Sequence, residues 1–171
     1  MRDVVSRTRI RWAAIGAAVA TTLGAGGIGM VRATSPADAV AFVPVAPCRI
    51  LDTRPDSTVG AKTSPFGPGE TVTIAAHGAP GNCTGVPATA TGVSINVTSV
   101  DATELTFLTM WPADEERPLA SSLNPSPGQP PTPNAVTAAL SPTGQFSIYN
   151  YQGSVHVLAD LVGYYTDHDH D

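Results

Sequence analysis

The chain has 171 residues and a formal net charge of −5, and its length leaves room for one ordinary domain. Lys and Arg are unevenly placed, because five of the nine precede residue 42 and only Arg49, Arg54, Lys62 and Arg117 follow it. Nucleic-acid affinity depends on cations that neutralise phosphates, so this acidic domain is not expected to bind nucleic acid or anionic lipid surfaces. The charge balance does not exclude neutral polysaccharides or proteins as partners.

Residues 1–41 have the layout of a signal peptide. Four arginines lie within the first eleven residues, and the stretch 12–31 is uncharged. Small residues precede two possible cleavage points, after Ala39 and after Ala41. We place cleavage after Ala41, which predicts a secreted domain over residues 42–166 without membrane insertion. The alternative is an uncleaved anchor, since about twenty uncharged residues can just span a bilayer.

Residues 42–97 alternate apolar and polar side chains in several short segments. Residues 42–45 form a short extended entry, and residues 49–55 lead into a loop rich in Gly, Pro and Ser. Residues 71–76 and 93–97 each alternate with a period of two, which predicts strands with one buried face.

The cysteines, Cys48 and Cys83, both follow the predicted signal peptide. An even cysteine number in an exported protein predicts a disulfide. This bridge would close a loop of about 35 residues and stabilise the fold by roughly 3 to 4 kcal/mol. Neither cysteine belongs to a CxxC pair or a histidine-rich segment, which argues against a zinc site or thiol catalysis.

Residues 105–111 have apolar side chains on both alternating faces, which predicts a central strand covered on two sides and ended by Pro112. The segment 118–133 contains six prolines and predicts a long surface loop around a short strand at residues 121–123. The loop would cross the surface between two sheet segments.

Alternation returns at residues 136–140 and again at 145–150, with a turn at 141–144 between them, and this spacing predicts a β-hairpin. Residues 155–164 predict the longest strand, which we expect to cross the middle of a sheet. No window after the signal segment has helical spacing over three turns. We therefore predict an all-β, antiparallel β-sandwich of about seven or eight strands with one disulfide.

Short motifs along the chain resemble a known pattern. The motifs are residues 45–54, 85–87, 96–98, 111–112, 122–124, 134–136 and 156–165. They are similar to a secreted actinobacterial all-β domain of uncertain function, and the Leu-Asp-Thr-Arg motif at 51–54 and the Asp-Leu-Val-Gly-Tyr strand at 160–164 are the most specific. The resemblance covers residues 42–165. It implies an extracellular location and a β fold, and it brings no activity, substrate or catalytic residue.

Three charged residues are candidates for a structural ion-pair network. Asp52 and Arg54 share a face of an extended segment, and Asp160 lies among apolar residues of the last predicted strand. A carboxylate in that environment requires a cation, and Arg49 or Arg54 is the expected partner. The catalytic alternative is that Asp52 and Asp160 are the paired carboxylates of a small glycoside hydrolase.

Trp111, Asn124, Asn134 and Tyr149 are the candidate binding residues, with Tyr151 as a further aromatic residue, since aromatic rings with an amide rim would suit sugars. The alternative is that the amides only satisfy turns at strand ends. The acidic and His-containing tail, residues 167–171, is expected to be flexible, and we expect no metal site, cofactor or catalytic residue.

The expected function is a secreted, non-catalytic binding or adhesion module at the cell envelope, whose partner is a polysaccharide or a surface protein. A self-associating structural surface protein is the first alternative. The small glycoside hydrolase is the second.

Overall fold

The computed structural model describes residues 40–167, which contain seven strands and one short 3-10 helix. Residues 1–39 of the predicted signal peptide and all but the first residue of the predicted tail lie outside the described residues, whereas Val40 and Ala41 belong to β1. The strands are β1 (Val40–Asp52), β2 (Thr71–Ala75), β3 (Ala90–Val100), β4 (Leu108–Pro112), β5 (Thr132–Ala139), β6 (Gln145–Asn150) and β7 (His156–Asp167), and the 3-10 helix is η1 (Pro55–Ser57). Among residues 40–167 no helix is long and apolar enough to cross a bilayer.

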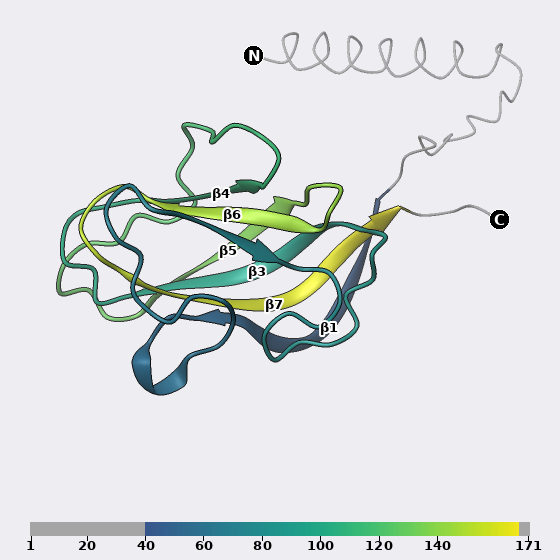
Figure 1. Ribbon diagram of the computed structural model, residues 1–171, viewed down its shortest axis with the longest axis horizontal. Coiled ribbons are helices and arrows are strands. Elements are labelled where there is room, and N and C mark those ends of the chain that lie inside the picture. Colours follow the sequence, from purple (N-terminus) through teal and green to yellow (C-terminus); the bar gives the residue numbers. More distant parts are fainter. Residues whose placement is uncertain (1–39, 168–171) are drawn as a thin grey trace, which may run out of the picture. The chain divides into compact units, whose positions relative to one another are not determined.

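The strands form two antiparallel sheets that face each other, which confirms the predicted β-sandwich (Figure 1). The four-stranded sheet has the order β1-β7-β3-β5, and the three-stranded sheet has the order β2-β6-β4. β7 lies between β1 and β3, as expected for a strand that crosses the middle of a sheet. The sheet reaches slightly past the expected domain limits, because Val40 pairs with Asp167.

The core lies between the two sheets and follows the period of two in the sequence. Alternate residues of β3, β6 and β7 point inward and are almost fully buried: Val93, Ile95, Val97, Phe146, Ile148, Val157, Ala159 and Leu161. The intervening residues face outward. The strand predictions over 71–76, 93–97, 145–150 and 155–164 are confirmed, since a strand lies in each of these segments.

The predicted hairpin of residues 136–140 and 145–150 is wrong. β5 pairs with β3 in the four-stranded sheet, whereas β6 pairs with β2 and β4 in the other sheet. The turn at 141–144, closed by the Gly144 N–H donating to Ser141 O, therefore leads the chain from one sheet to the other. Alternation defines which face of a strand is buried, but it does not determine which other strand pairs with it.

The prediction of a central strand at 105–111 is also wrong in its position. β4 covers only Leu108–Pro112 and is an edge strand. Its two faces are nevertheless both buried, because the chain returns beside it and Leu108 forms a bridge with Leu123. A covering loop produces the same two-sided apolar pattern as a central position.

β1 is the strand whose full length the sequence pattern does not predict. It has 13 residues against 12 in β7, so β7 is not the longest strand. Pro44 and Pro47 interrupt its alternation, and its pairing with β7 shifts register between Pro44 and Cys48 and again between Arg49 and Leu51. Bulges of this kind break the period of two on which strand prediction depends.

The Cys48–Cys83 disulfide is confirmed, with a Cα–Cα distance of 5.1 Å and a separation of 35 residues. It fixes the segment before β3 against the outer edge of β1. Asn82 N donates to Arg49 O at 2.8 Å, and a Cβ on Gly81 would lie only 2.6 Å from that same oxygen, so glycine is required for this approach.

Candidate functional site

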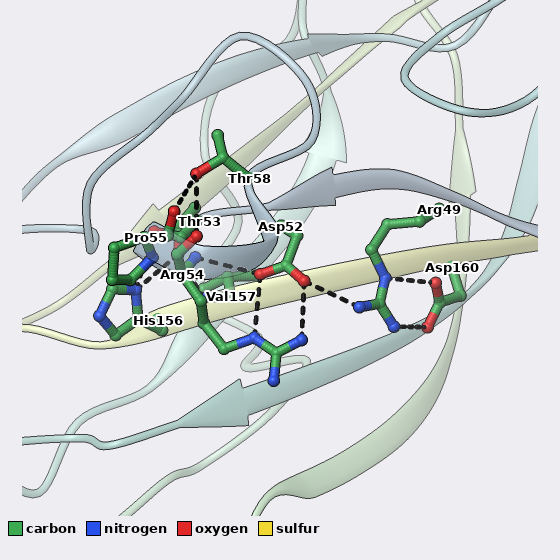
Figure 2. A network of polar contacts seen from close by, with 9 residues as sticks. All are labelled: Arg49, Asp52, Thr53, Arg54, Pro55, Thr58, His156, Val157 and Asp160. Atoms are coloured by element: carbon green, nitrogen blue, oxygen red, sulfur yellow. Dashed lines mark hydrogen bonds and ion pairs between the residues drawn. The ribbon is translucent and has the colours of Figure 1, made fainter.

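Arg49 is the centre of an ion-pair network on the outer face of the four-stranded sheet (Figure 2). Its Nε and Nη2 donate to the two carboxylate oxygens of Asp160 at 2.8 and 2.9 Å. Its Nη1 donates to Asp52 Oδ2 at 2.8 Å. One guanidinium thus joins the end of β1 to the middle of β7.

Asp52 is the buried member of this network. Its carboxylate accepts hydrogen bonds from Arg54 through the backbone N at 3.0 Å, Nε at 3.1 Å and Nη2 at 2.8 Å, while its side chain is fully buried. Burial alone would raise the pKa of Asp52, but the hydrogen bonds from Arg54 and Arg49 outweigh it and hold that pKa below its usual value. Asp52 therefore stays ionised over the whole range in which the domain is expected to work.

Asp52, Arg54 and Asp160, the predicted ion-pair residues, belong to one network, which Arg49 joins. Arg49, not Arg54, holds Asp160. The glycoside hydrolase alternative needs two carboxylates that reach a sugar, one of them protonated. A fully buried Asp52 with a lowered pKa offers neither property, so this geometry does not support that alternative.

Thr53 continues the attachment of β1 to β7, a contact that the sequence did not indicate. Its Oγ1 accepts from Val157 N at 3.0 Å, and its own backbone N donates to Val157 O at 3.2 Å. His156 Nδ1 lies 3.1 Å from Thr53 Oγ1. The Leu-Asp-Thr-Arg motif is thus engaged in structural contacts along most of its length.

A cluster of aromatic residues lies on the outer face of the three-stranded sheet. Phe107, Tyr149 and Tyr151 project from β6 and from the segment before β4, on the side opposite the buried Phe146 and Ile148. The rings of Phe107 and Tyr151 stack with centroids 4.8 Å apart and planes 13° apart, and Tyr149 lies 6.1 Å from Phe107. We call these three residues the aromatic platform.

The platform is open to solvent and has polar neighbours. Tyr151 is 49% exposed, and Phe107 and Tyr149 are partly exposed. Thr71 lies opposite Tyr149 in the β2–β6 pairing, and Thr73 Oγ1 lies 3.3 Å from Ser147 Oγ on the same face. The Arg117 guanidinium lies 3.9 Å from the centre of the Tyr149 ring, in the loop that rises from the end of β4 (Figure 1).

Of the four predicted binding residues, only Tyr149 belongs to this platform. Trp111 is 7% exposed, and its Nε1 donates to Glu115 O at 2.9 Å, so the expectation that its ring is a binding surface is wrong. Asn134 uses its Nδ2 to hold Ser122 O at 2.6 Å, which is the structural role weighed as the alternative. Asn124 is exposed, and no contact joins it to the platform among the described residues.

Phe107 and Arg117 were missed. Phe107 precedes β4 and Arg117 belongs to a loop, so neither has a periodic signal that would place it beside Tyr149. Tyr151, the other aromatic residue that the sequence analysis named, does lie in the platform, as the spacing of two residues from Tyr149 allows.

Thr109 lies on the same face, opposite Tyr149, but is fully buried. Its Oγ1 has no hydrogen-bond partner among residues 40–167, and an unpaired buried hydroxyl destabilises a fold. We expect Thr109→Val to raise the free energy of unfolding by about 1 kcal/mol and the melting temperature by roughly 3 °C. Thermal unfolding followed by circular dichroism measures this change.

Thr106→Val is the matched control for that substitution. Thr106 Oγ1 donates to Asn150 Oδ1 at 2.7 Å and accepts from Gln152 N at 3.0 Å, so the same change should lower stability there. A fall in stability for Thr109→Val would show that its hydroxyl has a partner and would contradict the prediction.

No family model, curated protein or solved structure matches this chain. The fold and the outer-face residues therefore define only a class of protein: an antiparallel β-sandwich with one disulfide, a structural ion-pair network on one sheet and an aromatic platform on the other.

Proposed function

We propose that this protein is a secreted, non-catalytic module that binds polysaccharide of the cell envelope through the aromatic platform. The observation that supports the proposal most directly is the stacked pair of Phe107 and Tyr151, which presents a half-exposed flat ring on the face where the exposed Thr71 lies opposite Tyr149. Flat rings give large apolar contact area at low entropic cost, and hydroxyls give the hydrogen bonds that sugars require.

The charges of the domain favour a sugar polymer over a nucleic acid as its ligand. Arg49, Arg54 and Lys62 are each held in salt bridges, at Asp52, Asp160 and Glu70. Arg117 is then the one cation outside a salt bridge among residues 40–167. One guanidinium cannot supply the several phosphate contacts that nucleic-acid binding needs.

Secretion is part of the proposal and is supported by the disulfide. Disulfides persist in oxidising compartments outside the cytoplasm. The Cys48–Cys83 bridge is therefore compatible with the extracellular location that the N-terminal segment predicts.

Retention on insoluble envelope polysaccharide and peptidoglycan tests the proposal. We expect saturable binding that Tyr151→Ala weakens by about tenfold, because the substitution removes the exposed ring of the stacked pair. Phe42→Ala is the matched control: Phe42 is 47% exposed and pairs with Tyr165 on the other sheet, with centroids 5.2 Å apart.

The two variants separate specific binding from general loss of an aromatic side chain. Equal retention of both variants would contradict a platform site, and absence of binding by the unaltered protein would overturn the polysaccharide proposal. Trp111→Ala is unsuitable here, because Trp111 is buried and its loss would disturb the fold.

A further inference from the structure

β5 is an open edge of the four-stranded sheet. It pairs with β3 on one side only, in an uninterrupted register from Thr132 opposite Ser99 to Ala139 opposite Gly92. Leu140 N donates to Thr91 O at 2.9 Å just beyond this register. In an antiparallel ladder alternate residues bond to the same neighbour, so Asn134, Val136 and Ala138 face β3, and Ala135, Thr137 and Ala139 direct their backbone groups away from it.

These outward groups have no backbone partner among the residues that the structure describes. Ala135, Thr137 and Ala139 are all exposed, and among residues 40–167 no backbone hydrogen bond outside the strand ladders reaches them. Pro133, the next outward residue, has no N–H to satisfy. The edge therefore offers three N–H groups and their neighbouring carbonyls in one row.

The other sheet edges are shorter, partly covered or interrupted: in β1, two prolines and two register shifts break the first part of the strand, and its last part has neighbours. Val59 bonds to Asp52 beside β1, and Asn82 donates to Arg49 O there. Leu123 bridges to Leu108 beside β4. β2 has five residues, whereas β5 has eight. Folded proteins usually protect long edges with charges, and β5 contains none.

The surroundings of β5 suit a second copy of the same chain. Residues 40–167 contain ten acidic and four basic residues, so most pairs of surfaces would bring like charges together. A shallow apolar hollow of about 210 Å³ adjoins the end of β5 and is lined by uncharged residues, among them Thr137, Ala139 and Tyr165.

We propose that β5 pairs antiparallel with β5 of a second copy of this chain, so that the two four-stranded sheets become continuous. The two-fold axis passes through Thr137, because this register opposes Thr137 to itself and Ala135 to Ala139 and uses every outward group. Such a contact is small, and the dimer is accordingly weak and concentration-dependent. It lies on the sheet opposite the aromatic platform and does not depend on polysaccharide binding.

Sedimentation of the protein expressed from its full 171-residue sequence, from about 10 μM to about 1 mM, tests the pairing. We expect the apparent mass to approach that of a dimer, and Thr137→Lys to weaken association by at least about tenfold, because a lysine on the axis meets its own copy. Ala75→Lys, at an exposed position on the edge strand β2, is the matched control and should leave association unchanged.

A monomer at every concentration would overturn the proposal, as would a dimer that Thr137→Lys leaves intact or that Ala75→Lys weakens equally. Thr137→Cys gives an independent measurement. Directly opposed residues in a hydrogen-bonded antiparallel pair have Cα atoms about 5.5 Å apart, which a disulfide can span. We expect covalent dimers on mild oxidation of Thr137→Cys and none with Ala75→Cys, and the reverse result would overturn the register.

Discussion

Asp52→Asn should lower the free energy of unfolding by about 3 kcal/mol, the value expected when one member of a buried ion pair is removed. The amide keeps the size of the side chain but loses the charge that holds Arg49 and Arg54. Both arginines remain partly exposed, at 29% and 37%, so water compensates some of the loss and the effect stays at the low end of the usual range. Urea denaturation measures the change.

Asp160→Asn is the matched control, because Asp160 is 24% exposed and bonds to Arg49 alone. We expect a loss of about 1 kcal/mol there. If either aspartate variant kept its full stability and lost a glycan-hydrolysing turnover, the ion-pair interpretation would fail and the hydrolase alternative would return.

The unaltered protein and the Asp52→Asn variant should differ in how their stability responds to acid. The pKa of Asp52 is lower in the folded protein than the value of about 3.9 in the unfolded chain. Its stabilising effect is then complete above that unfolded value and disappears as the pH falls through the folded pKa. The stability difference between the unaltered protein and Asp52→Asn should therefore be constant from pH 5 upward and shrink below about pH 4.

Local sequence patterns were sufficient for the parts of this fold that depend on local chemistry. Strict alternation identified β3, β6 and β7, since each has one face against the core. The pair of cysteines allowed only one bridge. The requirement of Asp160 for a cation followed from its apolar neighbours, and the structure supplies Arg49.

The parts that local patterns missed depend on contacts between distant segments. β5 and β6 have the spacing of a hairpin, but their partners are β3 on one sheet and β2 and β4 on the other. In the platform Phe107 meets Tyr149 from the segment before β4, and Arg117 lies over Tyr149 from a loop, and no spacing rule relates these residues. The low exposure of Trp111 could not be predicted, because it depends on the loop whose Glu115 carbonyl accepts its N–H.

Replacement of both Cys48 and Cys83 by serine should lower the free energy of unfolding by about 4 kcal/mol, because the unfolded chain regains the entropy of a 35-residue loop. The bridge lies one residue before Arg49, and Asn82 holds the Arg49 carbonyl next to it. Its loss should therefore also loosen the segment that presents the Arg49 guanidinium to Asp52 and Asp160.

Combining the two changes measures that coupling. If the disulfide positions Arg49 for the ion-pair network, the combined variant should lose less unfolding free energy than the two separate variants lose in sum. We expect this difference to be about 1 kcal/mol. Strict additivity in urea denaturation would mean that the bridge acts only on the unfolded chain. Polysaccharide binding at the platform should survive in the folded fraction of each variant, because the network and the bridge lie at the four-stranded sheet.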